Sequence, residues 1–193
     1  MTAFAAGMWG DGFGPGSYSD NSVLVDLTTL TNCGPPPELG RFTGGGQQVI
    51  IDPPGGPGPI ELAKGFEVDC DMNPVHENLE LNWQGNHFHM DQITSAHCTL
   101  QGPPEPPFAP VNRIDGTGLG SYNNTEGYTV VFTLIDNGEP GTNDMGTGDA
   151  SGFTVCLTDK ANPKECAIPA NVVLRAPLEP IENGNIQAHV DQH

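Results

Sequence analysis

The chain has 193 residues, of which 24 are acidic and 6 are basic, so its formal charge at pH 7 is -18. This negative surface would repel the phosphates of nucleic acids, and a nucleic-acid partner is not expected. Gly and Pro make up nearly a quarter of the residues, which disfavours long helices, and the longest apolar stretch, Thr129–Ile135, is far shorter than the roughly 20 residues that span a bilayer, so no membrane insertion is expected.

Residues 1–40 are predicted to form an extended N-terminal arm outside the folded domain. Residues 1–22 are rich in Gly, Ser and Ala, and the apolar run Ser22–Leu27 has the pattern of one short strand. Gly34–Pro37 follows as a stiff, extended, Pro-rich linker. A lone strand before such a linker cannot bury its apolar face by itself. It must therefore dock on its own domain or on another copy of the chain.

Residues 41–193 are predicted to fold as an all-β domain, an antiparallel β-sandwich of jelly-roll type. Short segments that alternate apolar and polar residues follow one another between Gly- and Pro-rich turns, and none has a helical period. The expected strands are 47–51, 65–70, 79–83, 86–90, 116–122, 128–135, 153–157, 171–175 and 185–190. A two-residue loop after 79–83 would place Leu81 opposite Phe88 and leave the histidines of the second strand on the polar face.

The five cysteines indicate an oxidising compartment. None belongs to a close C-x-x-C pair, which argues against a zinc or thioredoxin-type site. Their positions favour two disulfides, Cys70–Cys98 and Cys156–Cys166. Cys33 is then left over, either buried or able to cross-link subunits. The first ten residues lack the basic segment and long apolar core of a signal peptide, so we interpret the chain as a mature extracellular or cell-surface protein.

The acidic, Gly-rich loop of residues 136–152 is the first candidate binding site. Calcium prefers several oxygen ligands from a pliable loop, and this loop offers carboxylates and amides without the spacing of an EF-hand. The predicted calcium ligands are Asp136, Asn137, Glu139, Asp144 and Asp149. The alternative is a solvated loop, because Glu139–Thr142 has Pro and Gly at the positions that a type II turn favours.

Two histidines form the second candidate site. His87 and His89 lie two residues apart on one expected strand, so both imidazoles project to the same side of the sheet. With His97, Glu80 or Asp91 as a further ligand they could chelate copper or zinc. The alternative is a pair of exposed histidines on the polar face of a strand.

The aromatic residues suggest a glycan as a further partner. Trp83 and Tyr128 alternate with apolar residues and are expected in the core. Other rings could be exposed and stack on sugars, namely Trp9, Phe13, Tyr18 and Tyr122. No G-x-S-x-G, H-E-x-x-H or phosphate-binding Gly-Lys motif is present, so the protein is predicted not to be an enzyme.

Several segments together resemble a known bacterial module. They are Arg41–Gln47, Gly65–Asp71, Asn78–Trp83, Gly116–Gly118, Asp136–Gly141 and Gly184–His189. These segments are similar to those of the post-COAP-type domain, an accessory module of large secreted bacterial proteins. The resemblance covers most of residues 41–193 and implies an extracellular β-rich module, and it supplies no catalytic residues.

The function predicted from these features is a secreted structural subunit that self-associates into an extracellular fibre or surface assembly. Val23, Val25 and Leu27 would enter an apolar groove at the sheet edge of a neighbouring copy, with Leu24 facing outward and Cys33 able to lock the joint. Such head-to-tail contacts give open filaments when they do not close into rings. The alternative is a monomeric extracellular binding module for glycans or for calcium-dependent adhesion.

Overall fold

The structure, a computed structural model, describes residues 40–50, 58–72, 77–101, 109–138, 148–158 and 165–190. Within these ranges the strands are β1 (Gly40–Ile50), β2 (Ile60–Asp69), β3 (Asn78–Trp83), β4 (Asn86–Thr99), β5 (Arg113–Tyr122), β6 (Thr125–Ile135), β7 (Ala150–Leu157), β8 (Val172–Pro180) and β9 (Asn183–Val190). Two 3-10 helices, η3 (Glu165–Ala167) and η4 (Pro169–Asn171), precede β8. No helix in these ranges is long and apolar enough to cross a membrane. Residues 1–39 of the predicted arm lie outside the described residues.

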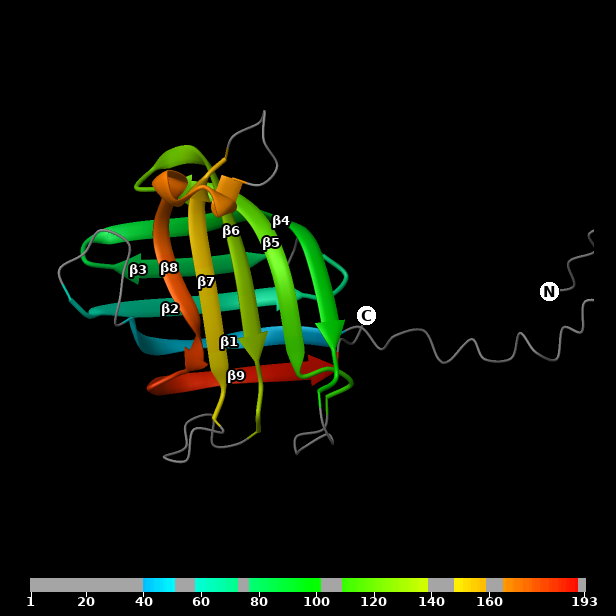
Figure 1. Ribbon diagram of the computed structural model, residues 1–193. Helices are drawn as coiled ribbons and strands as arrows, with labels where there is room; N and C mark the ends of the chain where they lie inside the picture. Colours follow the sequence, from blue (N-terminus) through cyan, green and yellow to red (C-terminus); the bar gives the residue numbers. More distant parts are fainter. Residues whose placement is uncertain are drawn as a thin grey trace, which may run out of the picture. The chain divides into compact units, whose positions relative to one another are not determined.

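All nine strands belong to one antiparallel sheet, in the order β8-β7-β6-β5-β4-β3-β2-β1-β9. β1 to β8 follow one another as a meander, and β9 returns to pair with β1, so β8 and β9 form the two edges. The sheet curls on itself, and in Figure 1 β5 to β8 pass in front of β3, β2, β1 and β9. The all-β antiparallel prediction is confirmed. The topology is one continuous curled sheet, however, whereas the strand pattern predicted the two sheets of a sandwich.

β4 and β5 have the local features that bend the sheet. The pairing of β4 with β5 shifts twice, between Met90 and Gln92 and between Ile93 and Ser95, and such bulges bend and twist a strand. The glycines of β5 leave room for atoms of the adjacent strands β4 and β6. A Cβ atom at Gly118 would lie 2.3 Å from the sulfur of Met90, so a larger residue would not fit without a shift.

The strands are longer than the sequence predicted. β1 begins at Gly40 rather than at Gln47, because its glycine-rich first half pairs with β2 on one side and β9 on the other. β4 continues to Thr99 rather than ending at Met90, and β8 continues to Pro180. These extensions have no clear alternation of apolar and polar residues, so they become strands through pairing with their neighbours.

The curl encloses one hydrophobic core. Its largest fully buried side chains are Phe42, Phe88, Phe132, Phe153, Ile50, Leu62, Leu79, Leu81, Met90, Ile114, Leu134 and Leu174. Each such side chain contributes about 1.5–3 kcal/mol when it leaves water. Leu81 pairs with Phe88, as the two-residue loop predicted, and Trp83 is buried as expected.

Lys64 departs from the apolar character of this core. Its side chain is 6% exposed and points to the inner face of β2, and its Nζ atom has no hydrogen-bond partner among the described residues. Burial lowers the pKa of Lys64 to about 8. Gln48 and Ser151, also buried, are satisfied instead: Ser151 Oγ donates to Gln48 Oε1 (2.9 Å), and Gln48 Nε2 donates to the Pro177 carbonyl (3.0 Å).

Two disulfides join neighbouring parts of the sheet. Cys70–Cys98 connects the chain just after β2 to the end of β4, and Cys156–Cys166 connects β7 to η3. These are the two pairs that the sequence predicted. Disulfides of this kind are compatible with an extracellular protein.

Candidate functional site

Asp136 and Asp149, two of the predicted calcium ligands, bind backbone amides at the edge of the sheet. Asp149 accepts hydrogen bonds from the Ile186 amide (2.6 Å) and the Asn137 amide (2.9 Å). Asp136 accepts from the Ala188 amide and from the Gly138 amide, both at 2.8 Å. Ile186 and Ala188 belong to β9, whose other side pairs with β1. The two carboxylates therefore cover the middle of an edge that would otherwise present unpaired amides.

These contacts give the acidic loop a structural role at its two ends. Glu139 and Asp144 lie outside the described residues, and Asn137 uses its side-chain amide to donate to the Gly148 carbonyl (2.9 Å). In the described ranges, no group of three or more His, Cys, Asp or Glu side chains is arranged to hold a metal ion. Calcium binding stays a prediction. A melting temperature that is the same with calcium and with chelator would contradict it, because a ligand of the folded state stabilises that state.

A cluster of titratable side chains lies on the outer face of the β3–β4 hairpin. Glu80 of β3 contacts both histidines of β4: one oxygen meets His87 Nε2, and the other meets His89 Nδ1 at 2.5 Å. His89 Nε2 lies 3.6 Å from Asp91 Oδ1. The pairing of β3 with β4 explains this arrangement, because Glu80 lies directly opposite His89. We call Glu80, His87, His89 and Asp91 the hairpin cluster.

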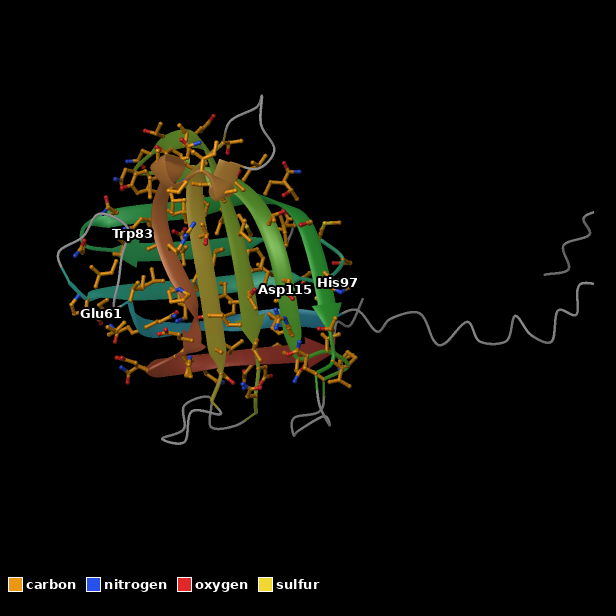
Figure 2. All side chains as sticks on the ribbon, viewed as in Figure 1. Glu61, Trp83, His97 and Asp115 are labelled. Carbon is orange, nitrogen blue, oxygen red and sulfur yellow. A yellow bond between two sulfur atoms is a disulfide. The ribbon has the colours of Figure 1, made fainter. Side chains whose placement is uncertain are left out.

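The other two described histidines, His97 and His189, lie apart from the hairpin cluster. His97 is also on β4, but it pairs across the strands with Asp115, and Figure 2 labels these two residues together on the right side of the molecule. His189 contacts Thr43 Oγ1 at 2.8 Å. His76 and His193 lie outside the described residues. Of the ligands proposed for a transition metal, the structure thus brings together both strand histidines, Glu80 and Asp91. Glu80 is hydrogen-bonded to both imidazoles, and Asp91 lies near His89.

A groove of about 590 Å³ begins at the turn of the same hairpin. Its lining residues are Gln47, Glu61, Ala63, Asn82, Trp83, Gln84, Gly85, Asn86 and His87. Figure 2 labels Glu61 and Trp83 at one end of the back layer, where β2 begins and β3 ends. Four of the lining residues carry amide side chains, and each amide offers both hydrogen-bond donors and an acceptor. We call this the first groove.

Trp83 packs beneath the first groove, and its ring is not exposed for stacking on a sugar. Its side chain is 5% exposed, and its ring stacks on Tyr122 with the centroids 5.6 Å apart. Burial, the main cause, raises the pKa of Tyr122, whose hydroxyl donates to Asn86 Oδ1 (2.7 Å). The aromatic residues thus hold the amide-bearing turn in place. The other rings suggested for stacking on sugars, those of Trp9, Phe13 and Tyr18, lie outside the described residues.

A second groove, of about 680 Å³, lies farther along β4. It is lined by Met72, Glu77, Asp91, Gln92, Ile93 and Thr94. Glu77 is positioned by the backbone, since it accepts a hydrogen bond from the Ile93 amide (3.1 Å) at the bulged part of β4. His87 lines the first groove and Asp91 lines the second, so the hairpin cluster connects the two.

Most groove residues were not predicted from the sequence. Asn82 could have been identified, because it alternates with the buried Leu81 and Trp83 on the polar side of a clear strand. Gln47 and Glu61 come from β1 and β2, and only the strand pairing brings them to the β3–β4 turn. The predicted assembly residues Val23, Leu24, Val25, Leu27 and Cys33 lie outside the described residues.

Comparisons with protein-family models, with curated proteins and with solved structures give no match. The resemblance to the post-COAP-type domain therefore stays a prediction.

Proposed function

We propose that this chain is an extracellular, non-enzymatic binding module that holds a saccharide in the first groove. The observation that carries the proposal is the lining of that groove, in which Gln47, Asn82, Gln84 and Asn86 surround one end of the hairpin. Amide side chains can donate and accept at once, which suits the hydroxyl groups of a sugar. The two disulfides and the acidic, Gly- and Pro-rich composition support an extracellular location.

The aromatic contacts behind the groove support a site that is formed before the ligand arrives. Asn86 Oδ1 accepts from Tyr122 and also from the Asn123 side chain (3.0 Å), while the His87 amide donates to Asn123 Oδ1 (2.9 Å). These bonds fix the β3–β4 turn against the β5–β6 turn. A ligand that binds a pre-organised surface loses less free energy to ordering the protein.

Titration of the full chain with neutral oligosaccharides, followed by calorimetry or by amide chemical shifts, tests this proposal. Asn82→Ala and Gln84→Ala should each weaken binding by about fivefold to tenfold, as expected for the loss of about one hydrogen bond. Gln101→Ala is the matched control, because Gln101 is exposed and lines neither groove. Equal affinity in all three variants would contradict binding at the first groove.

Self-association by strand donation is the second candidate function. The two edge strands of the sheet differ, and the difference favours β8 over β9 as the strand that would pair with a donated segment. β9 has its edge amides of Ile186 and Ala188 bound by carboxylates. β8 pairs on one side with β7 and is the other edge strand, and Leu178 on it is 45% exposed. An incoming strand from residues 23–27 of another copy would therefore add to β8.

The full chain with Val25→Asp tests strand donation by light scattering. A charge at this position should prevent the strand from entering an apolar groove and should abolish assembly, whereas Leu24→Asp, whose side chain is expected to face outward, should leave assembly intact. A wild-type chain that is monomeric at all concentrations would remove this candidate function. Assembly that is unchanged in Val25→Asp would mean that the contact lies elsewhere.

A further inference from the structure

We infer that the saccharide bound by this module is a linear chain carrying protonated amino groups, which lies along β4 across both grooves. The inference rests on the proposed function and specifies its ligand. Three observations carry it: the grooves are connected, their charge has one sign, and the carboxylates concerned remain exposed.

The first observation is that one line of contacts joins the two grooves. His87, in the wall of the first groove, contacts Glu80, and Glu80 contacts His89. His89 in turn faces Asp91, in the wall of the second groove. At about 3.3 Å per residue, the segment from His87 to Thr94 extends over about 23 Å. A linear oligomer, rather than a single sugar, matches this length.

The second observation is the charge of this surface. The two grooves and the cluster between them present four carboxylates, those of Glu61, Glu77, Glu80 and Asp91. The described residues that line the grooves include no Lys and no Arg. A saccharide with carboxylate or sulfate groups would be repelled here, and one with ammonium groups would be attracted.

The third observation is that these carboxylates are accessible to a ligand. The side chain of Glu80 is 34% exposed and that of Asp91 is 54% exposed. Their nearest contacts are imidazoles, which can turn away when an ammonium group approaches. Asp149, by contrast, is fully buried and holds two backbone amides. The negative charge of the hairpin cluster is therefore placed where a ligand can reach it.

A basic peptide would satisfy the same charge but not the lining of the first groove. Four amide side chains and one carboxylate fit a ligand with many hydroxyl groups and few charges close together. A lysine side chain offers three donors and no acceptor, so it cannot meet both the donors and the acceptors of these amide side chains. The charge and the amides together favour an amino saccharide.

The test is calorimetric titration of the full chain with four hexamers: glucosamine, N-acetylglucosamine, a uronic acid and lysine. The buffer keeps the sugar amines protonated. The glucosamine hexamer should bind at least about tenfold more tightly than the N-acetylated one, and the uronic acid hexamer should not bind. A glucosamine dimer should bind more weakly than the hexamer, because it cannot reach from one groove to the other.

Substitutions locate the charge effect. Glu80→Gln combined with Asp91→Asn should weaken the glucosamine hexamer about tenfold and leave the N-acetylglucosamine hexamer unchanged. The control is Glu126→Gln, since Glu126 is exposed and lines neither groove. A loss of about threefold in the control, which removes one charge rather than two, would show that only the net charge of the protein matters, and it would overturn the inference.

The remaining outcomes separate this inference from the proposed function. Equal binding of the glucosamine and N-acetylglucosamine hexamers would overturn the amino saccharide and leave the saccharide module standing. If no saccharide binds, the proposed function fails and the inference fails with it. If the lysine hexamer binds as tightly as the glucosamine hexamer, the surface is a general site for cations, and the saccharide assignment is overturned.

Discussion

The carboxylates at the β9 edge and those of the β3–β4 hairpin show two different uses of the same chemical group. Asp136 and Asp149 each accept two backbone hydrogen bonds and close an edge of the sheet. Glu80 and Asp91 lie beside imidazoles on an exposed strand face; Asp91 lines the second groove, and Glu80 contacts His87 of the first. The first pair stabilises the fold, and the second pair is placed to meet a ligand.

The surroundings of an acidic residue, rather than the number of acidic residues nearby, thus indicate its role. With 24 acidic residues in the chain, clusters arise by chance in the sequence. A buried carboxylate persists only when hydrogen bonds compensate for its lost hydration, and at the β9 edge the backbone supplies those bonds. An exposed carboxylate beside a groove needs no such compensation and can exchange its partner for a ligand.

The largest effect should come from Asp149→Ala. This change removes two charge-assisted hydrogen bonds, each contributing about 1.5–3 kcal/mol, and it leaves two amides without their acceptor. We expect the free energy of unfolding to fall by about 3–6 kcal/mol, measured by urea denaturation. Glu80→Gln is the matched comparison and should cost less than about 1 kcal/mol, because its contacts are half-exposed. Similar losses in both variants would contradict the contrast between the two regions.

Removal of the disulfides should have the next largest effect. Cys70–Cys98 ties the chain just after β2 to the end of β4 and has a sequence separation of 28, whereas the separation of Cys156–Cys166 is 10. On the chain-entropy model, Cys70→Ala with Cys98→Ala should cost about 3–4 kcal/mol, and the other pair should cost less because its loop is shorter. Urea denaturation of the two double variants measures both losses. A larger loss for Cys156–Cys166 would show that strain or local packing outweighs the loop term.

The sequence predicted the parts of this molecule that depend on local pattern. Alternation identified the β3–β4 hairpin and its register, including the pair Leu81 and Phe88, and cysteine positions indicated both disulfides. The sequence did not predict that the glycine-rich start of β1 forms a strand, because a glycine has no side chain to show which face is buried. The choice between one curled sheet and two sheets also depends on the bulges in β4, which alternation does not report.

The candidate site was predictable only in part, for a related reason. The pair His87 and His89 follows from the two-residue period of a strand, and Glu80 faces them through a short hairpin. Gln47 and Glu61 reach the same groove from strands farther away in the chain. The contacts of Asp136 and Asp149 with β9 connect residues that lie 52 and 37 positions apart in the sequence, and no local pattern predicts a hydrogen bond over that separation.

Lys64 lies on the inner face of β2, and its substitution tests whether the inner face of the sheet affects stability independently of the grooves on the outer face. Its pKa in the folded protein is about 8, below the ordinary value of 10.5, because burial disfavours the charged form. Below pH 8 the folded protein therefore bears the full cost of this shift, about 3 kcal/mol. Lys64→Met should raise the free energy of unfolding at pH 7 by up to that amount, and it should leave saccharide binding unchanged.

The pH dependence of this effect has a definite sign. Between pH 8 and 10.5 the unfolded chain binds more protons at Lys64 than the folded chain does, so the contribution of this residue to stability rises with pH. The difference between the wild type and Lys64→Met should be greatest below pH 8 and should vanish toward pH 10.5. Comparing the two proteins by urea denaturation removes the contribution of other groups that titrate in this range. A constant difference across the range would mean that the ammonium group is hydrated in the folded protein.

Asp115→Asn should have the smallest effect on the free energy of unfolding. This carboxylate is paired with an arginine, unlike those at the β9 edge and in the hairpin cluster. Asp115 lies on β5, where Arg113 donates two hydrogen bonds to it (2.6 and 2.8 Å) and Thr133 donates one (2.7 Å). The bond from Arg113 is the main cause that lowers the pKa of Asp115 below its ordinary 3.8. Its side chain is 38% exposed, so solvent screens these contacts, and we expect a loss below about 1 kcal/mol at neutral pH.

The stability difference between the wild type and Asp115→Asn should depend on pH in acid. Its size would show whether Asp115 acts like the edge carboxylates or like those of the hairpin cluster. Because the pKa is lowered in the folded protein, the stabilisation is fully present above the unfolded value and is lost as the pH falls through the folded value. The difference between wild type and variant should therefore shrink below about pH 4, as measured by urea denaturation in acid. A loss of several kcal/mol would place Asp115 with the edge carboxylates. No loss at all would place it with Glu80 and Asp91, as an exposed carboxylate whose partners can be exchanged for a ligand.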